Sequence, residues 1–336
     1  MKNEKTSTAL RGGASGLYLF EWVVIGYAVL TLLLMVVLWG RLVNPGSMLL
    51  LRVGAVAMTI ALWQLYRWKP SKLTMLLRVV GQMVLLSRWY PDTYEFNRLF
   101  LNLDHIFAGW EQTVFGCQPA LLFSQNFSSP VLSELLSLGY VSYFPMIAAL
   151  AFYYFWERYD RLPYCTFVIL ASFFLFYVIF IFLPVAGPQF YYEAVGFDQI
   201  AQGNFPDLGH YFYQHGEMVS LPGAEGGLFH ELVQQAHDAG ERPTAAFPSS
   251  HVGISVVLLW LAWERKGRGY RRTWGLFIPL AVLTLLMFFA TFYIQAHYAI
   301  DAIAGIFVGT GMYFLFRWVF RLWREDYRLQ TLDYRR

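Results

Sequence analysis

Apolar runs of about 20 residues recur along this chain of 336 residues and constrain its fold more than any other feature. A helix that crosses the hydrocarbon core of a bilayer needs about 20 mostly apolar residues. Strong runs of this kind cover 17–39, 48–66, 131–156, 164–184, 275–295 and 297–320. A shorter run at 249–263 and an interrupted run at 73–90 complete the set. We therefore expect an all-α integral membrane protein, a polytopic bundle of about eight transmembrane helices with six as the minimum.

The composition supports this class of protein. Hydrophobic residues make up 57% of the chain and charged residues 14%, against about 45–50% and about 25% in soluble domains. Such a chain cannot cover a water-facing surface, which excludes a soluble enzyme and a disordered regulator. The net charge of +3 is small, and no separate basic domain is present that would bind nucleic acid.

The distribution of Lys and Arg predicts the orientation in the membrane. Basic residues crowd the segment 264–274 and the tail 321–336, and they also occur at the N-terminus and in 157–163. The long segment 185–248 contains one strongly basic side chain, Arg242. Because an excess of Lys and Arg marks cytoplasmic loops, we expect both termini in the cytoplasm and 185–248 on the periplasmic or lumenal face.

The run at 73–90 has two interpretations. Arg78, Gln82 and Arg88 interrupt it, so it could be an amphipathic helix lying in the interface. The orientation favours a span. Residues 131–156 must run inward for 157–163 to be cytoplasmic, which requires an odd number of crossings before them.

The chain divides into three parts: N-terminal spans plus an outer-face segment in 1–130, a catalytic helical bundle in 131–320, and a basic cytoplasmic tail in 321–336. Within 91–130 we expect short helices along the outer face. Asp104 and Glu111 in this segment could touch a headgroup, but surface acids are commonly just solvated. The loop 185–248, rich in Gly, Pro, His and Tyr, is expected to cap a site. In the last span, Gly305, Gly309 and Gly311 predict close helix packing.

Three ionisable residues stand where apolar helices should have none. His251 opens one span, and His297 and Asp301 open another; such residues are functional candidates by default. If His297 and Asp301 share a helix face, the carboxylate can accept a hydrogen bond from Nδ1–H and leave Nε2 as a nucleophile. A facing His251 could protonate a leaving oxygen. The alternative is that each is an ordinary interface residue.

Two motifs carry a resemblance to a known family. The segment 247–253, Phe-Pro-Ser-Ser-His-Val-Gly, resembles the second signature of the type 2 phosphatidic acid phosphatase superfamily. The segment 297–301, His-Tyr-Ala-Ile-Asp, resembles its third signature. The resemblance covers 164–320, the last four spans. It implies that His297 is a nucleophile that forms a phosphohistidine, that Asp301 orients it, and that His251 is the general acid and then the base.

The same resemblance implies phosphate contacts from Ser249, Ser250 and nearby backbone N–H groups, because a helix start favours anions. The family's first signature, a Lys followed at a distance by Arg-Pro, is absent, and Thr291 replaces the Arg six residues before the nucleophile. These departures resemble the branch of inositol phosphorylceramide synthases and sphingomyelin synthases. A diester headgroup carries one negative charge and needs fewer cations than a monoester. Arg242 either pairs with the substrate phosphate or anchors its loop to lipid headgroups.

The expected function is transfer of a phospho-headgroup, for example phosphoinositol, from a phospholipid to a lipid alcohol such as ceramide. One alternative is a lipid phosphate phosphatase with water as the acceptor, and another is a non-enzymatic lipid-binding scaffold. We expect lipid partners only, with no nucleic acid, no cofactor and no metal. Four loop histidines could suggest zinc, but the one motif that starts like His-Glu-x-x-His has Gln234 in the last position; the four are His210, His215, His230 and His237.

Overall fold

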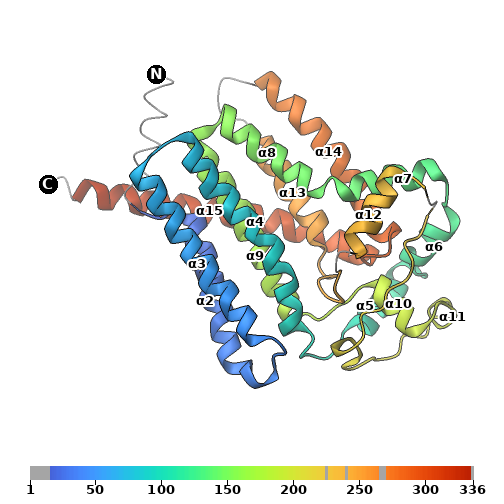
Figure 1. The fold of residues 1–336 in the computed structure, drawn as a ribbon. Helices are drawn as coiled ribbons and strands as arrows, with labels where there is room; N and C mark the ends of the chain where they lie inside the picture. Colours follow the sequence, from blue (N-terminus) through green and yellow to red (C-terminus); the bar gives the residue numbers. More distant parts are fainter. Residues whose placement is uncertain (1–15, 224–225, 239–240, 265–269, 334–336) are drawn as a thin grey trace.

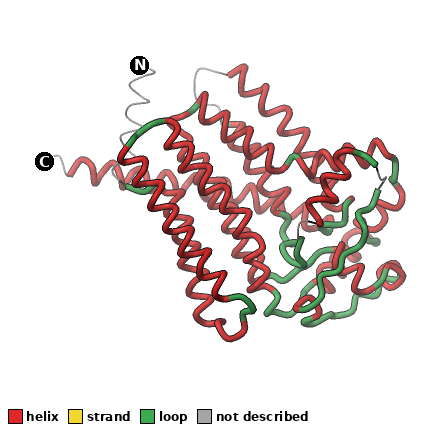
Figure 2. Tube along the Cα trace, in the orientation of Figure 1, coloured by secondary structure: helices red, strands yellow, loops and turns green. Residues whose placement is uncertain are grey.

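The computed structural model describes residues 16–223, 226–238, 241–264 and 270–333, and every regular element in these ranges is a helix (Figure 2). The long helices are α2 (Leu19–Leu38), α3 (Pro45–Trp68), α4 (Lys72–Asn97), α9 (Leu162–Phe182), α14 (Tyr270–Tyr293) and α15 (Ala299–Asp333). The shorter α-helices are α5 (Asp104–Phe115), α6 (Pro119–Asn126), α7 (Pro130–Val141), α8 (Tyr143–Glu157), α10 (Pro188–Val195), α11 (Phe197–Ala201), α12 (Leu228–Asp238) and α13 (Ser250–Trp263). Three short 3-10 helices are η1 (Trp39–Arg41), η2 (Tyr159–Arg161) and η3 (Tyr211–Tyr213).

Five helical segments in the described ranges are long and apolar enough to cross a membrane. They are Leu19–Arg41, Pro45–Trp68, Tyr159–Phe182, Trp274–Tyr293 and Ala299–Trp323, and α7 with α8 makes a sixth if the pair is one bent span. The structure therefore shows an integral membrane protein by length and composition. The expected eight spans are not confirmed, because α13 has 14 residues and α4 is not among the segments that qualify.

The run 131–156, expected as one helix, is two helices that meet at 48°. The break falls at Ser142, whose hydroxyl donates to the carbonyl of Gly139 at 2.6 Å. Pro145, in the first turn of α8, has no N–H to donate to the carbonyl of Val141. As a consequence α7 packs against α14 and α12, while α8 packs against α9 and α13.

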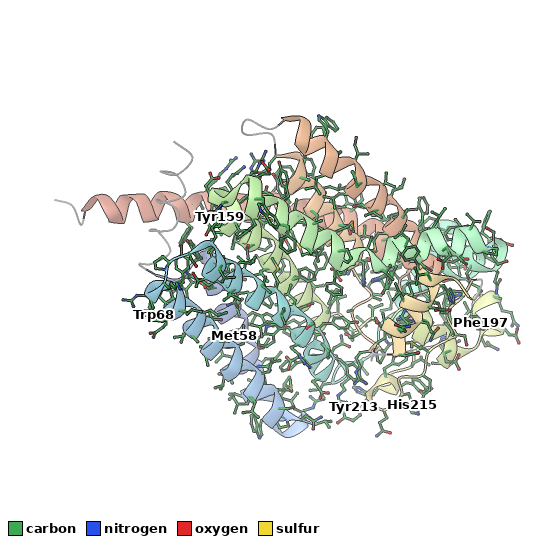
Figure 3. The ribbon with its side chains drawn as sticks, turned by 45° about the horizontal axis from the view of Figure 1, so that its top comes forward. Met58, Trp68, Tyr159, Phe197, Tyr213 and His215 are labelled. Atoms are coloured by element: carbon green, nitrogen blue, oxygen red, sulfur yellow. The ribbon has the colours of Figure 1, made fainter. Side chains whose placement is uncertain are left out.

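The centre of the bundle is α9, which packs against α2, α4, α13 and α15 (Figure 1). Its residues are apolar all round, as expected of a helix enclosed by other helices. The bundle has two ends. Trp68 and Tyr159 lie at one end, away from Tyr213 and His215 (Figure 3). We call the other end, where α13 and α15 begin, the histidine end.

Two of the three polar residues that interrupt the run 73–90 point into the protein. Arg78 forms an ion pair with Glu21 of α2, and both side chains are fully buried. Gln82 and Thr59 of α3 exchange a hydrogen bond at 3.1 Å. Arg88 is exposed. An interfacial helix would hold Arg78 and Gln82 in water, so their burial favours the transmembrane interpretation of α4.

Two glycines of α15 let it approach α13 closely. A Cβ at Gly309 would lie 2.2 Å from the carbonyl oxygen of Gly253, and one at Gly305 would lie 2.6 Å from that of Ser249. The expectation of close packing is thus confirmed for both. It is wrong for Gly311, which faces open space because it lies on a different side of the helix.

The loop 185–248 contains α10, α11, η3 and α12, and α12 packs against α7. Glu134 of α7 accepts hydrogen bonds from the backbone N–H groups of Phe229 and His230, at 3.1 and 2.9 Å. A carboxylate is a favourable partner for the free N–H groups at a helix start. This contact fixes the second half of the loop on the histidine end.

Candidate active site

His251 and His297 face each other at the histidine end. His251 is the second residue of α13, and His297 lies in the turn between α14 and α15. Nδ1 of His251 is 3.4 Å from Nε2 of His297, and the ring centroids are 5.6 Å apart. His297 is buried, whereas His251 is partly exposed. One small group could therefore contact both imidazoles.

The prediction of a hydrogen bond between His297 and Asp301 is wrong. His297 precedes α15, so the two residues do not share a helix face, and Nδ1 lies 3.8 Å from Oδ2 of Asp301, too far for a hydrogen bond. The chain turns at Gln295, which has a φ of +64°. Nδ1 of His297 instead lies 2.7 Å from the carbonyl oxygen of Ala246. A carbonyl can only accept, so Nδ1 carries the proton and Nε2 presents a lone pair.

Asp301 supports the turn that carries His297. Its Oδ2 accepts the backbone N–H of Tyr298 at 2.8 Å, and Oδ1 is buried with no hydrogen-bond partner among the described residues. A carboxylate at the third position of a helix commonly satisfies a free N–H group just before it. Asp301 therefore holds the backbone next to His297, and its carboxyl oxygen lies 3.8 Å from the ring.

Ser249 and Ser250 begin α13. The hydroxyl of Ser249 is buried and accepts the backbone N–H of Val252 at 3.4 Å, which is the capping role of Ser at a helix start. The N–H of Ser249 donates to the carbonyl of Asp301 at 3.0 Å and so joins the starts of α13 and α15. The carbonyl of Ser250 accepts from the hydroxyl of Tyr143 at 3.4 Å. Phosphate contacts by these serines stay a prediction.

Arg242 is exposed, and its guanidinium lies 5.9 Å from the centroid of the Tyr94 ring at the end of α4. Its contact among the described residues is thus with an aromatic face rather than with either histidine. Contact with a substrate phosphate stays a prediction.

Asp104 is a residue of the site that sequence reasoning missed. It was expected to be solvated, and this is wrong, because its side chain is fully buried. Its carboxylate accepts the N–H groups of Ala186 and Gly187 at 2.7 and 2.8 Å, the amide of Asn102 at 2.5 Å and the hydroxyl of Tyr298 at 3.0 Å. Burial raises the pKa of Asp104, and these four hydrogen bonds oppose that rise. Asp104 thereby joins the segment after α9 to the residue that follows His297.

Glu111, also expected to be solvated, is fully buried under the start of α15. Its Oε2 accepts the N–H of Ile300 at 3.1 Å. Burial raises its pKa to about 8, partly offset by this and other backbone hydrogen bonds. The sequence did contain a signal for the burial of both acids. Helical spacing puts them on the same face of α5 as two apolar residues, Phe107 and Ala108.

Aromatic rings surround His251. The ring of Tyr140 stacks on it with centroids 4.7 Å apart, and that of Tyr143 lies at 4.5 Å. The ring of Tyr140 also meets that of His237 of α12, edge to face, with centroids 6.4 Å apart. These contacts fix the plane of the His251 ring, so that Nδ1 stays directed at His297.

Glu241 is a second acidic residue near this pair. It lies in the segment that leads to Ala246, is partly exposed, and accepts a hydrogen bond from the hydroxyl of Tyr90 at 3.2 Å. Burial raises its pKa, which the Tyr90 hydroxyl and the neighbouring His297 lower again. A carboxylate in this position favours a positively charged His297.

The other loop histidines are dispersed. His210 and His215 are exposed, whereas His230 and His237 are buried. Burial lowers the pKa of His237 to about 4. No three His, Cys, Asp or Glu side chains of the described residues gather in a geometry that could hold a metal ion.

The fold and the site together define a polytopic helical membrane protein with a centre of two facing histidines. The family model of the PAP2 superfamily matches residues 105–315, more than half of the chain, and the protein belongs to this superfamily. Membership indicates lipid phosphatase or phosphotransferase chemistry. The matched segment begins within α5 and so includes Glu111. Comparisons with curated proteins and with solved structures give no match.

Proposed function

We propose that the protein is a membrane phosphotransferase that moves a phospho-headgroup from a phospholipid to a lipid alcohol through a phosphohistidine on His297. The observation that carries this proposal is the pairing of Nε2 of His297 with Nδ1 of His251 at 3.4 Å, with Nδ1 of His297 held by Ala246. The held tautomer supplies a nucleophile, and the second ring supplies an acid.

In the first half-reaction, the lone pair of Nε2 of His297 attacks phosphorus. The N–P bond forms as the bond between phosphorus and the oxygen of the diacylglycerol breaks. His251, protonated, donates its proton to that oxygen, so diacylglycerol leaves as an alcohol. The carbonyl of Ala246 stabilises the positive charge that develops on the His297 ring, because it accepts from Nδ1–H.

In the second half-reaction, His251 takes the proton of the acceptor hydroxyl. The acceptor oxygen attacks phosphorus, the N–P bond breaks, and His297 returns to its neutral form. Two half-reactions through one covalent intermediate predict ping-pong kinetics. With a lipid alcohol such as ceramide as the acceptor, the product is a second phospholipid. The predicted orientation places this chemistry on the periplasmic or lumenal side.

A second candidate is a lipid phosphate phosphatase, with water as the acceptor. The partial exposure of His251 supports it, since water can reach the group that would activate it. A third candidate, a non-enzymatic lipid-binding scaffold, predicts no covalent intermediate.

The test uses purified protein and a phospholipid that carries a label in the headgroup phosphate, with and without a lipid alcohol. Transferase activity moves the label into a new lipid. Release of the label to the aqueous phase at an undiminished rate with the alcohol present would favour the phosphatase instead.

Substitution of the paired histidines separates the enzyme from the scaffold. His297→Ala and His251→Ala are expected to lose nearly all turnover, whereas Gln202→Ala, which removes an exposed polar side chain of the outer loop, should keep it. Acid-labile, base-stable labelling of the wild type but not of His297→Ala would identify the intermediate. Full activity of a correctly folded His297→Ala protein contradicts both enzyme proposals.

A further inference from the structure

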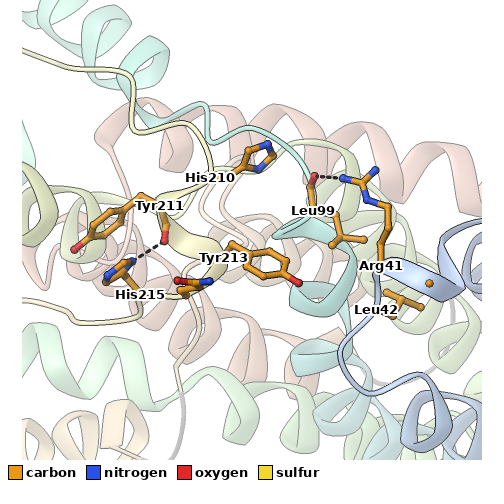
Figure 4. A pocket seen from close by; sticks show the side chains of 9 residues that line it. Arg41, Leu42, Leu99, His210, Tyr211, Tyr213 and His215 are labelled. Atoms are coloured by element: carbon orange, nitrogen blue, oxygen red, sulfur yellow. Dashed lines mark hydrogen bonds between the residues drawn. The ribbon is translucent and has the colours of Figure 1, made fainter.

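A cavity of about 550 Å³ lies between the end of α2 and the loop segment that contains η3 (Figure 4). It is lined by Leu99, which follows α4, and by polar side chains from two distant parts of the chain. These polar residues are Arg41, His210, Tyr211, Tyr213, Gln214 and His215. The described residues that line it include no carboxylate.

Two of the nitrogen-bearing side chains are fixed by backbone carbonyls. Arg41 donates from Nη2 to the carbonyl of Leu99 at 3.3 Å, which holds the guanidinium at the rim. His215 lies with Nδ1 3.0 Å from the carbonyl of Tyr211, and its ring stacks on the Tyr211 ring with centroids 4.1 Å apart. Nδ1 of His215 therefore carries the proton, and Nε2 remains for an external partner. Arg41 and His215 are thus held in place before any ligand binds. We call this cavity the groove.

The position of the groove along the membrane normal follows from α2. Arg41 is the last residue of the span Leu19–Arg41. The turns just before it expose apolar side chains, with Val36 exposed by 68% and Val37 by 80%. Exposed apolar residues on a spanning helix face lipid tails, and an Arg at its end lies at the level of the headgroups. A lipid lying along α2 would therefore place its headgroup beside Arg41.

We propose that this groove binds the headgroup of an anionic glycerophospholipid from the surrounding leaflet. The guanidinium of Arg41 suits the phosphate oxygens, since Arg forms strong contacts with phosphate. His210, Gln214 and the hydroxyl of Tyr213 add polar groups for the rest of the headgroup. The exposed apolar residues of α2 take the acyl chains. The absence of acids among the described lining residues favours a net negative headgroup over a zwitterionic one.

The test compares dioleoyl phosphatidylglycerol with dioleoyl phosphatidylcholine, each titrated into the full chain in detergent micelles. The readouts are the thermal midpoint and the number of bound lipids by native mass spectrometry. Phosphatidylglycerol should raise the midpoint more than phosphatidylcholine does. In the double variant Arg41→Gln, His210→Gln, its apparent affinity should fall about tenfold and one bound lipid should be lost.

Arg88→Gln is the matched control, since Arg88 is an exposed arginine of α4 outside the groove, and it should bind as the wild type does. If the double variant unfolds without lipid, Tyr213→Phe removes a single hydroxyl and should weaken binding by a smaller factor. Unchanged phosphatidylglycerol binding in the groove variants, or equal effects of both lipids on the wild type, would overturn the proposal.

Discussion

At the scale of residues, the geometry of His297 depends on one distant backbone carbonyl and on two carboxylates that hold the residue next to it. The carbonyl of Ala246 fixes its tautomer, and Tyr298 beside it is held by the carboxylates of Asp104 and Asp301. Each of these contacts would orient the proposed nucleophile through its surroundings. Their loss should therefore lower turnover through misplacement rather than through lost chemistry.

Asp104→Asn tests this arrangement. An asparagine offers one accepting oxygen, so its NH₂ group would face donors such as the N–H of Ala186 or Gly187. We expect turnover to fall by up to about 100-fold, because small misplacements of catalytic groups cost that much. KM should change less than kcat. Asp198→Asn, an exposed acid on α11, is the control. An unaltered kcat in Asp104→Asn would show that Asp104 does not help to position His297.

The buried carboxyl of Glu111 predicts a pH dependence of stability. Burial raises its pKa to about 8 in the folded protein, whereas in an unfolded chain the pKa of Glu is about 4.3. Between these values the folded state keeps a proton that the unfolded state releases. This contribution to stability is therefore full below about pH 4.3 and is lost as the pH rises through about 8.

Glu111→Gln abolishes this titration. Its thermal midpoint, measured by scanning fluorimetry in detergent, should vary less between about pH 5 and about pH 8 than that of the wild type. An identical pH slope in both proteins would show that Glu111 does not hold its proton in the fold.

At the scale of elements, the contact between α13 and α15 sets the separation of the two histidines, because each helix carries one of them at or just before its start. Two glycines of α15 allow the backbones to touch, while Gly311 on the same helix faces open space. This difference offers a matched pair of substitutions.

Gly309→Ala places a Cβ 2.2 Å from a backbone oxygen that cannot move aside. We expect a loss of stability of about 1–3 kcal/mol or more, as in other overpacked sites, with lower turnover. Gly311→Ala should be neutral or stabilise by up to about 1 kcal/mol through helix propensity. Thermal midpoints of the two variants in the same detergent make the comparison. Equal destabilisation by both would contradict the close approach at Gly309.

The sequence was sufficient to find the two histidines, because an ionisable side chain at the start of an apolar run is conspicuous. It also located the long helices, since a membrane span demands a long apolar run, but it did not show the break at Ser142 that divides 131–156 into two helices. It could not show that His297 bonds to Ala246, which depends on a tertiary contact and on the turn at Gln295. Nor could it show that Asp104 and Glu111 are buried rather than solvated, because their burial arises only when α5 packs against α15.

At the scale of the whole molecule, α4 runs the full length of the bundle. Its first half meets the start of α2 through the Arg78–Glu21 pair. Its end, at Phe96, packs in one cluster with Leu42 between α2 and α3 and with Ile181 at the end of α9. A helix that touches both ends of a spanning neighbour covers the same thickness, which supports its assignment as a span.

Single cysteines test this topology. With Cys117 and Cys165 replaced, cysteines at the exposed positions Asn44 and Asn204 should react with a membrane-impermeant maleimide from the same side, and one at Lys69 from the opposite side. If α4 instead lay in the interface, Lys69 and Asn204 would share a side. The pattern of labelling in sealed vesicles of one orientation decides between them.

The position of α5 determines the smallest fragment that could preserve the paired imidazoles. Asp104 and Glu111 precede the bent α7–α8 pair, yet they accept hydrogen bonds from Tyr298 and Ile300 at the start of α15. A truncation that starts after α5 would strip both acids from that turn, whereas one that starts before Asn102 would retain them. Chimaeras that exchange the amino-terminal helices should accordingly be joined between α4 and α5.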